Sequence, residues 1–295
     1  MPNSHLSLEA RDLTSIDKVI QTAPRQVLLA RTLLAPVTGI APFASTYRYF
    51  YSEEFGKAKF ANENSNDVPM VDENLTPVDQ PIFRIEVGAQ WTDEEINQAR
   101  MANLTLDTTR AETAVRAVAE LENQVAFLGD KAHGIEGLLN NTYSKSNVSA
   151  STDTFDNMKP EDIVEAIRKQ RAIITEKIGM SMLKPVLGLA PHAYEQLNRR
   201  YGEYDSRSIM AVLQANQWFS QIVAIPELQD IAKKGSNSLV VFDNTPSTAG
   251  LLIAQPIARS QEEIKDFWTH RIGFFERFGG SVLRRPDLVA RLDNI

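Results

Sequence analysis

The chain has 295 residues, of which 43% are apolar and 23% charged, with a formal net charge of −7 and no cysteine. This balance is typical of a globular protein that is long enough for one large or two ordinary domains. It excludes disulfides, thiolate metal sites and a cysteine nucleophile, and the absence of any block of like charge gives no sign of a nucleic-acid-binding protein.

The N-terminal region predicts neither a signal peptide nor a membrane anchor. Residues 1–13 lack a basic leader and an apolar core, and no apolar run approaches the roughly 18 residues needed to span a bilayer. We therefore expect a soluble protein made in the cytosol. Residues 1–33 are polar with isolated apolar side chains, and the stretch 13–20 permits one amphipathic helix. We interpret this region as an arm that lies on a neighbouring subunit rather than as a frayed terminus.

Segments with the residue pattern of β-strands flank a long acidic segment. Residues 46–51 are rich in aromatic side chains, 56–61 follow as a second strand, and 82–88 alternate with period two. Between them, residues 62–81 carry three prolines and no lysine or arginine, which predicts a loop. Such a long loop is unusual inside a compact domain. The pattern predicts a projecting β-hairpin that a partner subunit orders.

A long helix follows, which we call the spine helix. Residues 108–128 contain no proline or glycine, and Ala114, Val118, Leu121, Val125 and Leu128 fall on one helical stripe. Its length is about 30 Å, and Gly129 ends it. Upstream, Thr92 with a glutamate three residues later is a capping-box signature that predicts a helix over residues 93–101.

The remaining chain alternates short helices and strands without a regular repeat, which predicts an α+β fold. A helix is expected from residue 160 to about 177, with shorter helices at 191–199, 206–216 and 226–233. A turn is expected at Gly279-Gly280. The expected strands are 143–150, 182–189, 220–225, 239–242, 251–254, 263–278, 281–284 and 288–292.

No motif for catalysis, cofactor binding or metal binding is found. The four histidines are far apart, and no phosphate-binding loop or nucleophile elbow occurs. We interpret Glu112, Glu120 and Glu122 as residues that solvate the spine helix or pair with Arg110 and Arg116. The sequence therefore predicts no catalytic, cofactor-binding or metal-binding residue, and a protein that is not an enzyme.

Two basic pairs are candidate contacts between subunits. Lys57 and Lys59 lie on one face of a predicted strand, where edge lysines also serve to prevent aberrant strand pairing. Arg284 and Arg285 follow the predicted Gly-Gly turn, where they either meet acidic groups of a neighbouring chain or belong to an ordinary solvated turn.

The order of these parts resembles the major capsid proteins of tailed bacteriophages, which have the Hong Kong 97-like fold, and in particular their encapsulin-like subgroup. The resemblance covers nearly the whole chain from about residue 34. The motifs that carry it are Gly56-Lys-Ala-Lys59, Ala99-Arg-Met-Ala102, Leu121-Glu-Asn123, Phe127-Leu-Gly-Asp130, Gly134-Ile-Glu-Gly-Leu-Leu-Asn140, Phe278-Gly-Gly280 and Arg284-Arg-Pro286.

The resemblance implies a subunit of four parts. These are an N-terminal arm (1–33), an extended hairpin loop (46–90), a peripheral domain with the spine helix (34–45, 91–158 and 256–279), and an axial domain (159–255 and 280–295). It further implies an icosahedral virion shell of pentamers and hexamers, assembled in the host cytoplasm around double-stranded DNA. The implied partners are a separate scaffolding protein, a portal and a decoration protein. The resemblance implies no cofactor and no contact with a membrane.

Two other functions are weighed against the virion shell. One is an encapsulin-type nanocompartment that encloses a protein cargo, and the other is an α+β enzyme whose site the sequence does not reveal. For a DNA-filled shell we expect a lumen less acidic than the exterior. The candidate lumen-facing basic residues are Arg11, Lys18, Arg25 and Arg31.

Overall fold

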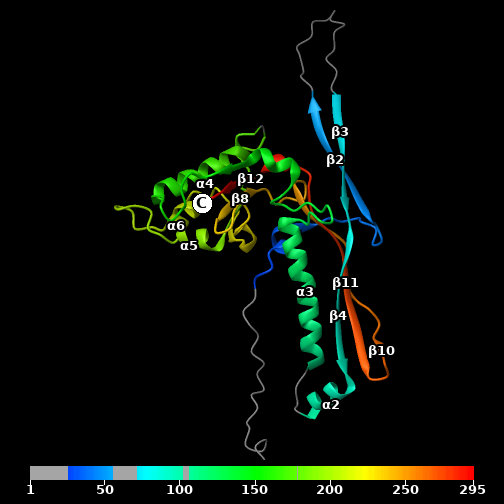
Figure 1. The fold of residues 1–295 in the computed structure, drawn as a ribbon. Coiled ribbons are helices and arrows are strands. Elements are labelled where there is room, and N and C mark those ends of the chain that lie inside the picture. The colour runs from blue at the N-terminus through cyan, green and yellow to red at the C-terminus, as the bar shows by residue number, and fades with distance from the viewer. Residues whose placement is uncertain (1–25, 56–71, 102–105, 178) are drawn as a thin grey trace, which may run out of the picture.

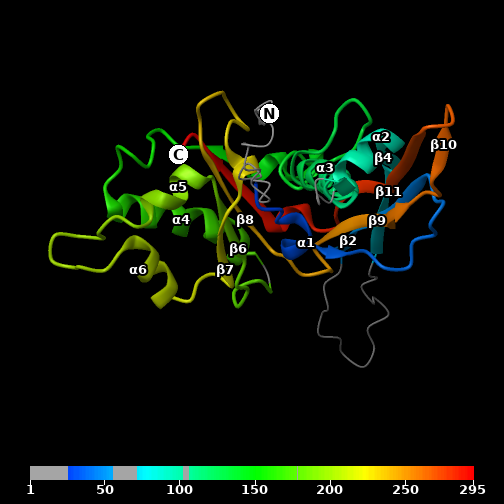
Figure 2. The same cartoon turned by 90° about the horizontal axis from the view of Figure 1, so that it is seen from below.

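The computed structural model describes residues 26–55, 72–101, 106–177 and 179–295. It shows an elongated subunit of mixed helices and strands, in which a compact lobe stands beside a long arm (Figure 1). The arm is built on one five-stranded sheet, the long sheet, and the lobe on another, the short sheet. Figure 2 shows the two parts from below, with the spine helix α3 seen nearly end on.

The long sheet is organised around β11 (Thr269–Leu283), a strand of 15 residues. Strand β4 (Phe83–Thr92) pairs antiparallel with it along one side. Strand β9 (Ala249–Arg259) and the short β10 (Glu263–Lys265) pair antiparallel with it as well, and β1 (Ala35–Pro36) adds parallel to β9. Most of the long sheet therefore depends on hydrogen bonds to one strand.

The predicted spine helix is confirmed as α3 (Leu106–Leu128), which runs along the long sheet (Figure 1). Ala114 packs against the sheet with Trp91 and Phe274 in a small apolar cluster. Leu121, predicted to lie on the buried stripe, is 43% exposed. The prediction is wrong there because the base of the helix turns a different side, with Glu122 and Asn123, toward the N-terminal segment.

The predicted projecting hairpin exists, but with different strands. β2 (Thr46–Phe55) pairs with β3 (Asp72–Pro81) along its whole length, so the second part of the predicted loop 62–81 is a strand. The strand predicted near 82–88 is β4, which belongs to the long sheet instead. Prolines are tolerated in β3 because a two-stranded ribbon has free edges on both sides. The strand predicted at 56–61 lies outside the described residues.

The short sheet has the strand order β5-β12-β8-β6-β7. Its strands are fully buried at β6 and β8, as expected for the middle of a covered sheet. Its strands are β5 (Val148–Ala150), β6 (Val186–Leu189), β7 (Gln221–Ala224), β8 (Ser238–Phe242) and β12 (Val289–Asp293).

Helices surround the short sheet, and one apolar core joins them to the base of α3. Pro160 begins α4, as predicted, and Glu161 and Asp162 follow in its first turn. The helical elements of the described residues besides α3 are α1 (Ala30–Leu33), α2 (Asp93–Met101), η2 (Thr142–Asn147), α4 (Pro160–Thr175), α5 (Pro191–Gln196), α6 (Ile209–Ala215), η3 (Pro226–Leu228) and η4 (Pro286–Leu288). Of these, α2 lies at the far end of the arm (Figure 1).

Other predictions of secondary structure are wrong. The helix predicted over 226–233 is only the 3-10 turn η3, and the strand predicted over 182–189 is limited to β6. Residues 142–147 form a 3-10 helix before β5 rather than a strand, because Asn141 caps them by accepting from the Tyr143 N–H. The strand predicted over 263–278 is interrupted by a turn at Asp266 and Phe267, which have positive φ. Gly279-Gly280 does not turn the chain, since β11 continues through both residues with a shift of register.

Gly280 is required where β11 passes the loop after the spine helix. Its φ is +80°, and a Cβ there would lie 2.5 Å from Ile135 Cγ2 and 2.9 Å from the Glu136 carbonyl oxygen. The side chain of Gln80, at the base of the hairpin, donates to Gly279 O at 2.7 Å. The glycine thus allows hairpin, loop and long sheet to meet.

We predict that Gly280→Ala lowers the free energy of unfolding by about 2 to 4 kcal/mol, through steric overlap and a left-handed backbone. Gly39→Ala is the matched control, because Gly39 has a similar φ of +82° but no atom lies within 4 Å of the position that its Cβ would take. It should cost only about 1 kcal/mol. Urea unfolding of both variants measures the difference, and equal losses would contradict the steric role.

Candidate functional site: the polar junction at the base of the spine helix

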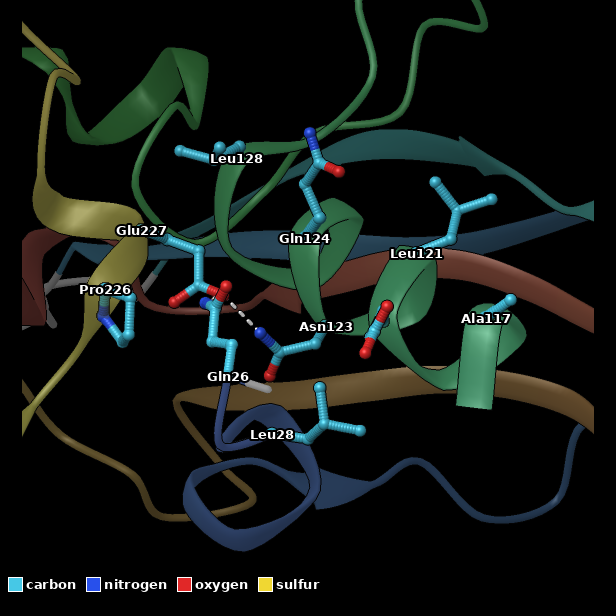
Figure 3. A pocket seen from close by; sticks show the side chains of 10 residues that line it. Gln26, Leu28, Ala117, Leu121, Asn123, Gln124, Leu128, Pro226 and Glu227 are labelled. Atoms are coloured by element: carbon cyan, nitrogen blue, oxygen red, sulfur yellow. Dashed lines mark hydrogen bonds between the residues drawn. The ribbon is translucent and has the colours of Figure 1, made fainter. Parts of the chain in front are cut away.

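A cluster of polar side chains lies where the N-terminal segment, α3, η3 and β11 meet. We call it the polar junction, and Figure 3 shows the part of it that borders an open pocket. Its members come from residues far apart in sequence, and three of them are buried carboxylates. The polar junction consists of Gln26, Arg31, Glu122, Asn123, Glu227 and Glu276.

Asn123 fixes the N-terminal segment to the spine helix. The short helix α1 has no capping side chain of its own, so its first N–H groups need outside acceptors. Asn123 Oδ1 accepts from the N–H groups of Leu29 at 2.8 Å and Ala30 at 2.9 Å. The Asn123 amide donates to Glu227 Oε1, which also accepts from Gln26 Nε2 at 2.6 Å. One buried amide therefore joins three segments.

Arg31 serves two buried carboxylates at once. Its Nε and Nη2 donate to Glu122 at 2.8 and 2.6 Å, and Nη2 also lies 2.9 Å from Glu276 Oε1. The side chains of Glu122 and Glu276 are 3% and 0% exposed, whereas that of Arg31 is 51% exposed. Hydrogen bonds to Glu122 raise the pKa of Arg31. The N-terminal segment thus supplies the positive charge that α3 and β11 require.

The carboxylates outnumber the cation, and this changes their protonation. Burial, followed by the negative charge of Glu122, raises the pKa of Glu276 to about 8. Burial also raises the pKa of Glu227, and its Oε2 is buried without a hydrogen-bond partner among the described residues. The junction therefore holds protons on its buried carboxyl groups and binds backbone N–H groups through Asn123. Both properties serve to hold the fold together.

The pocket beside the junction has a volume of about 650 Å³. Leu28, Leu121 and Leu128 give it apolar walls, and Asn123 and Glu227 stand at its polar end (Figure 3). The pocket is open, so the described residues do not enclose a small molecule in it.

The sequence did not reveal the junction. Glu122, predicted to solvate the spine helix, is buried, while Glu120 does pair with Arg116 at 2.9 Å as predicted. A buried glutamate is expected only where a cation reaches it, and the partner Arg31 is 91 residues away in the chain. No local pattern carries that pairing.

Of the predicted contact residues, three lie in the described part of the chain. Arg31 is in the polar junction, and its position toward a lumen stays a prediction. Arg284 donates to Pro246 O at 2.7 Å, and Arg285 lies 3.7 Å from Asp287, so both contact their own chain here. The others, Lys57, Lys59, Arg11, Lys18 and Arg25, lie outside the described residues.

Each of the three described histidines contacts a carboxylate. His133 lies 2.5 Å from Asp130, and His192 lies 3.1 Å from Asp156. His270 stands between Asp93 and Glu262, and hydrogen bonds to both carboxylates raise its pKa. Among the described residues, no group of three or more potential ligands is arranged to hold a metal ion. In the same ranges, no helix is long and apolar enough to cross a membrane.

Comparison with known proteins identifies the class of protein. Residues 56–295 match the family described as "Major capsid protein". The fold is similar to the capsid of Myoviridae phage XM1 (TM-score 0.80, 14% identity, 99% of this chain and 100% of that chain). It is also similar to the capsid of a native GTA particle (TM-score 0.71, 11% identity, 99% and 98%). A virus-like particle from Pyrococcus furiosus gives a TM-score of 0.60 (16% identity, 88% and 90%).

The family match extends over far more than half of the chain, and the structural matches span almost all of it. None of the curated protein sequences matches the chain. The protein has the capsid fold of tailed phages, as the sequence predicted. It belongs to the major capsid protein family, whose members are the subunits from which capsid shells assemble.

We predict that Glu276→Gln makes stability less dependent on pH. The folded pKa of about 8 lies above the ordinary 4.5, so the folded chain keeps a proton that the unfolded chain releases. The stabilisation that this proton provides is complete below the unfolded pKa of Glu276 and is lost as the pH rises through the folded pKa. The free energy of unfolding of the variant minus that of the wild type should therefore be ~2–4 kcal/mol more positive at about pH 9 than at about pH 5.

Urea unfolding across this pH range measures the effect. The control is Glu263→Gln, which removes an exposed carboxylate on β10. It should leave the pH profile of the wild type unchanged. Parallel profiles for Glu276→Gln and the wild type would show that Glu276 has no shifted pKa.

We predict that Asn123→Ala lowers the free energy of unfolding by about 2 to 3 kcal/mol, because it leaves two backbone N–H groups and Glu227 without this partner. The control, Gln124→Ala, removes an exposed amide from the next position of the same helix and should change stability by less than about 0.5 kcal/mol. Thermal unfolding compares the two, and similar midpoints for both variants would contradict the anchoring role of Asn123.

Proposed function

We propose that this chain assembles into an icosahedral virion shell that encloses double-stranded phage DNA. The observation that carries the proposal is the family match over residues 56–295, together with a fold shared over its whole length with phage and GTA capsids. In this proposal the subunits form pentamers and hexamers in the host cytoplasm. The protein acts as a building block and has no enzymatic activity.

The shape of the subunit supports assembly with copies of itself. The β2–β3 hairpin projects from one end of the arm (Figure 1). Phe50 and Leu75 on this hairpin are 57% and 51% exposed. Apolar side chains on a projecting ribbon are stabilised when a neighbouring subunit covers them. We propose that the hairpin, with Lys57 and Lys59, overlies the adjacent subunit.

The division into parts that the resemblance implies belongs to the same proposal. We propose residues 1–33 as an N-terminal arm, 46–90 as the extended hairpin together with the strand β4 that continues it into the long sheet, and a peripheral domain of residues 34–45, 91–158 and 256–279. Residues 159–255 and 280–295 then form the axial domain at the five- and six-fold axes. Arg284 and Arg285 are candidate contacts between subunits, and Arg11, Lys18, Arg25 and Arg31 candidate basic residues of the lumen.

Other components of a virion are part of the proposal. A separate scaffolding protein guides assembly, a portal admits the DNA, and a decoration protein binds outside. The DNA is held by contacts without sequence preference. A second candidate function is a nanocompartment that encloses protein cargo, and the similarity to the Pyrococcus furiosus virus-like particle favours it over unrelated functions.

We predict that the full chain, expressed alone or with neighbouring genes, forms closed particles visible by electron microscopy. Particles from phage-infected cells should contain nuclease-protected double-stranded DNA, since the shell encloses the genome. Size-exclusion chromatography and nucleic-acid extraction measure both properties. A discrete monomer or dimer under all these conditions would refute shell assembly, whereas closed particles with protein cargo and no DNA would favour the nanocompartment.

A further inference from the structure

The turn between β10 and β11 exposes aromatic side chains at the far end of the arm. Phe267 is 89% exposed and Trp268 is 68% exposed, and Ile264 on β10 is 62% exposed. Asp266 and Phe267 have φ values of +53° and +66°, a backbone region that favours glycine. We call Phe267 and Trp268 the aromatic knob. The subunit carries both an unfavourable backbone and unburied rings here, which indicates a role in binding.

Residues of α2, the start of α3 and the long sheet, which meet at this end of the arm, line a pocket of about 610 Å³. Its floor consists of Trp91, Ile272 and Phe274, which are at least nine-tenths buried. We call it the end pocket. Its rim is polar and charged, with side chains from α2, β9 and the turn region: Asp93, Asn97, Arg259, Glu262 and His270. An apolar floor with a charged rim suits an apolar side chain that is flanked by charges.

The rim of the end pocket is held in place by His270. Its Nε2 lies 2.7 Å from Asp93 Oδ1 and its Nδ1 lies 2.6 Å from Glu262 Oε1, so the imidazole links α2 to the segment before β10. The Asp93 N–H donates to Trp268 O at 3.0 Å. The knob is therefore fixed beside the pocket of its own chain, yet neither ring lines that pocket.

We propose that the aromatic knob of one copy enters the end pocket of a neighbouring copy of this chain. The inference rests on the proposed assembly into shells, in which every subunit is surrounded by identical subunits. Lys265 and Asp266 flank the knob and complement the rim, since Lys265 can meet the carboxylates of the rim and Asp266 can meet Arg259. Because knob and pocket are different surfaces of one chain, identical copies can repeat the contact around a symmetry axis of the shell.

The first test uses the absence of cysteine from the natural sequence. Two single variants, Phe267→Cys and Asn97→Cys, are co-assembled into particles and oxidised, so that each chain carries one thiol. A disulfide-linked dimer on a non-reducing gel is expected from the mixture and not from either variant alone. The control mixture, Tyr204→Cys with Asn97→Cys, places the first thiol on an exposed loop of the lobe and should give no dimer.

The second test separates the ring from the backbone conformation. Phe267→Gly removes the ring and suits the positive φ, so the free subunit should unfold at the same or a higher denaturant concentration. Assembly should nevertheless require about a tenfold higher subunit concentration, as for loss of an aromatic anchor at an interface. Gln217→Gly is the matched control, since it relieves a similar backbone strain (φ +50°) at an exposed position of the lobe and keeps the whole knob. Asn97→Trp, which obstructs the pocket, should reproduce the assembly defect of Phe267→Gly.

The outcomes distinguish this contact from shell assembly itself. Particles that form without the disulfide dimer, and with equal assembly of Phe267→Gly and Gln217→Gly, would overturn the knob-in-pocket contact and leave the proposed function intact. A wild-type chain that forms no particle would overturn both. The disulfide dimer together with a defect confined to the variants that remove the ring or obstruct the pocket would establish the contact.

Discussion

The structure depends on the burial of two glutamates that share one arginine from the N-terminal segment and one proton, held by Glu276. Glu122 belongs to the spine helix and Glu276 to the central strand of the long sheet, and Arg31 hydrogen-bonds both where helix and sheet meet. Without Arg31 the charge of Glu122 would be buried unpaired. Burying an unpaired charge is costly, and breaking a buried pair is generally more destabilising than never having it. The segment before β1 is therefore part of the fold of the arm.

The same constraint explains how lobe and arm form one unit. The apolar core runs from the short sheet to the base of α3, and the polar junction closes it on the side of the N-terminal segment. Beyond that base, the arm is one sheet covered by one helix, with only small apolar clusters among the described residues. A thin arm buries less surface per residue than a lobe does, and its exposed ends gain stability when other subunits cover them.

The sequence predicted the elements whose signals are local. The capping box Thr92–Glu95 forms as expected, with Thr92 N donating to Glu95 at 3.0 Å, and it starts α2 at the predicted residue. Pro160 begins α4 for an equally local reason. Strand β3 was missed because its prolines and acidic residues are typical of loops, and only pairing with β2 makes it a strand. Glu122 was misjudged because its partner comes from another part of the chain.

The prolines of the hairpin affect how free subunits behave before they assemble. A shell protein accumulates to high concentration, and a free two-stranded ribbon offers both of its edges to identical ribbons. Pro77 and Pro81 lack the N–H that such pairing requires, and the ion pair of Arg48 and Asp79, 2.6 Å apart, adds charge to the same ribbon. The prolines and charged residues that made β3 look like a loop in the sequence thus act as gatekeeper residues, which oppose edge-to-edge aggregation of newly made chains.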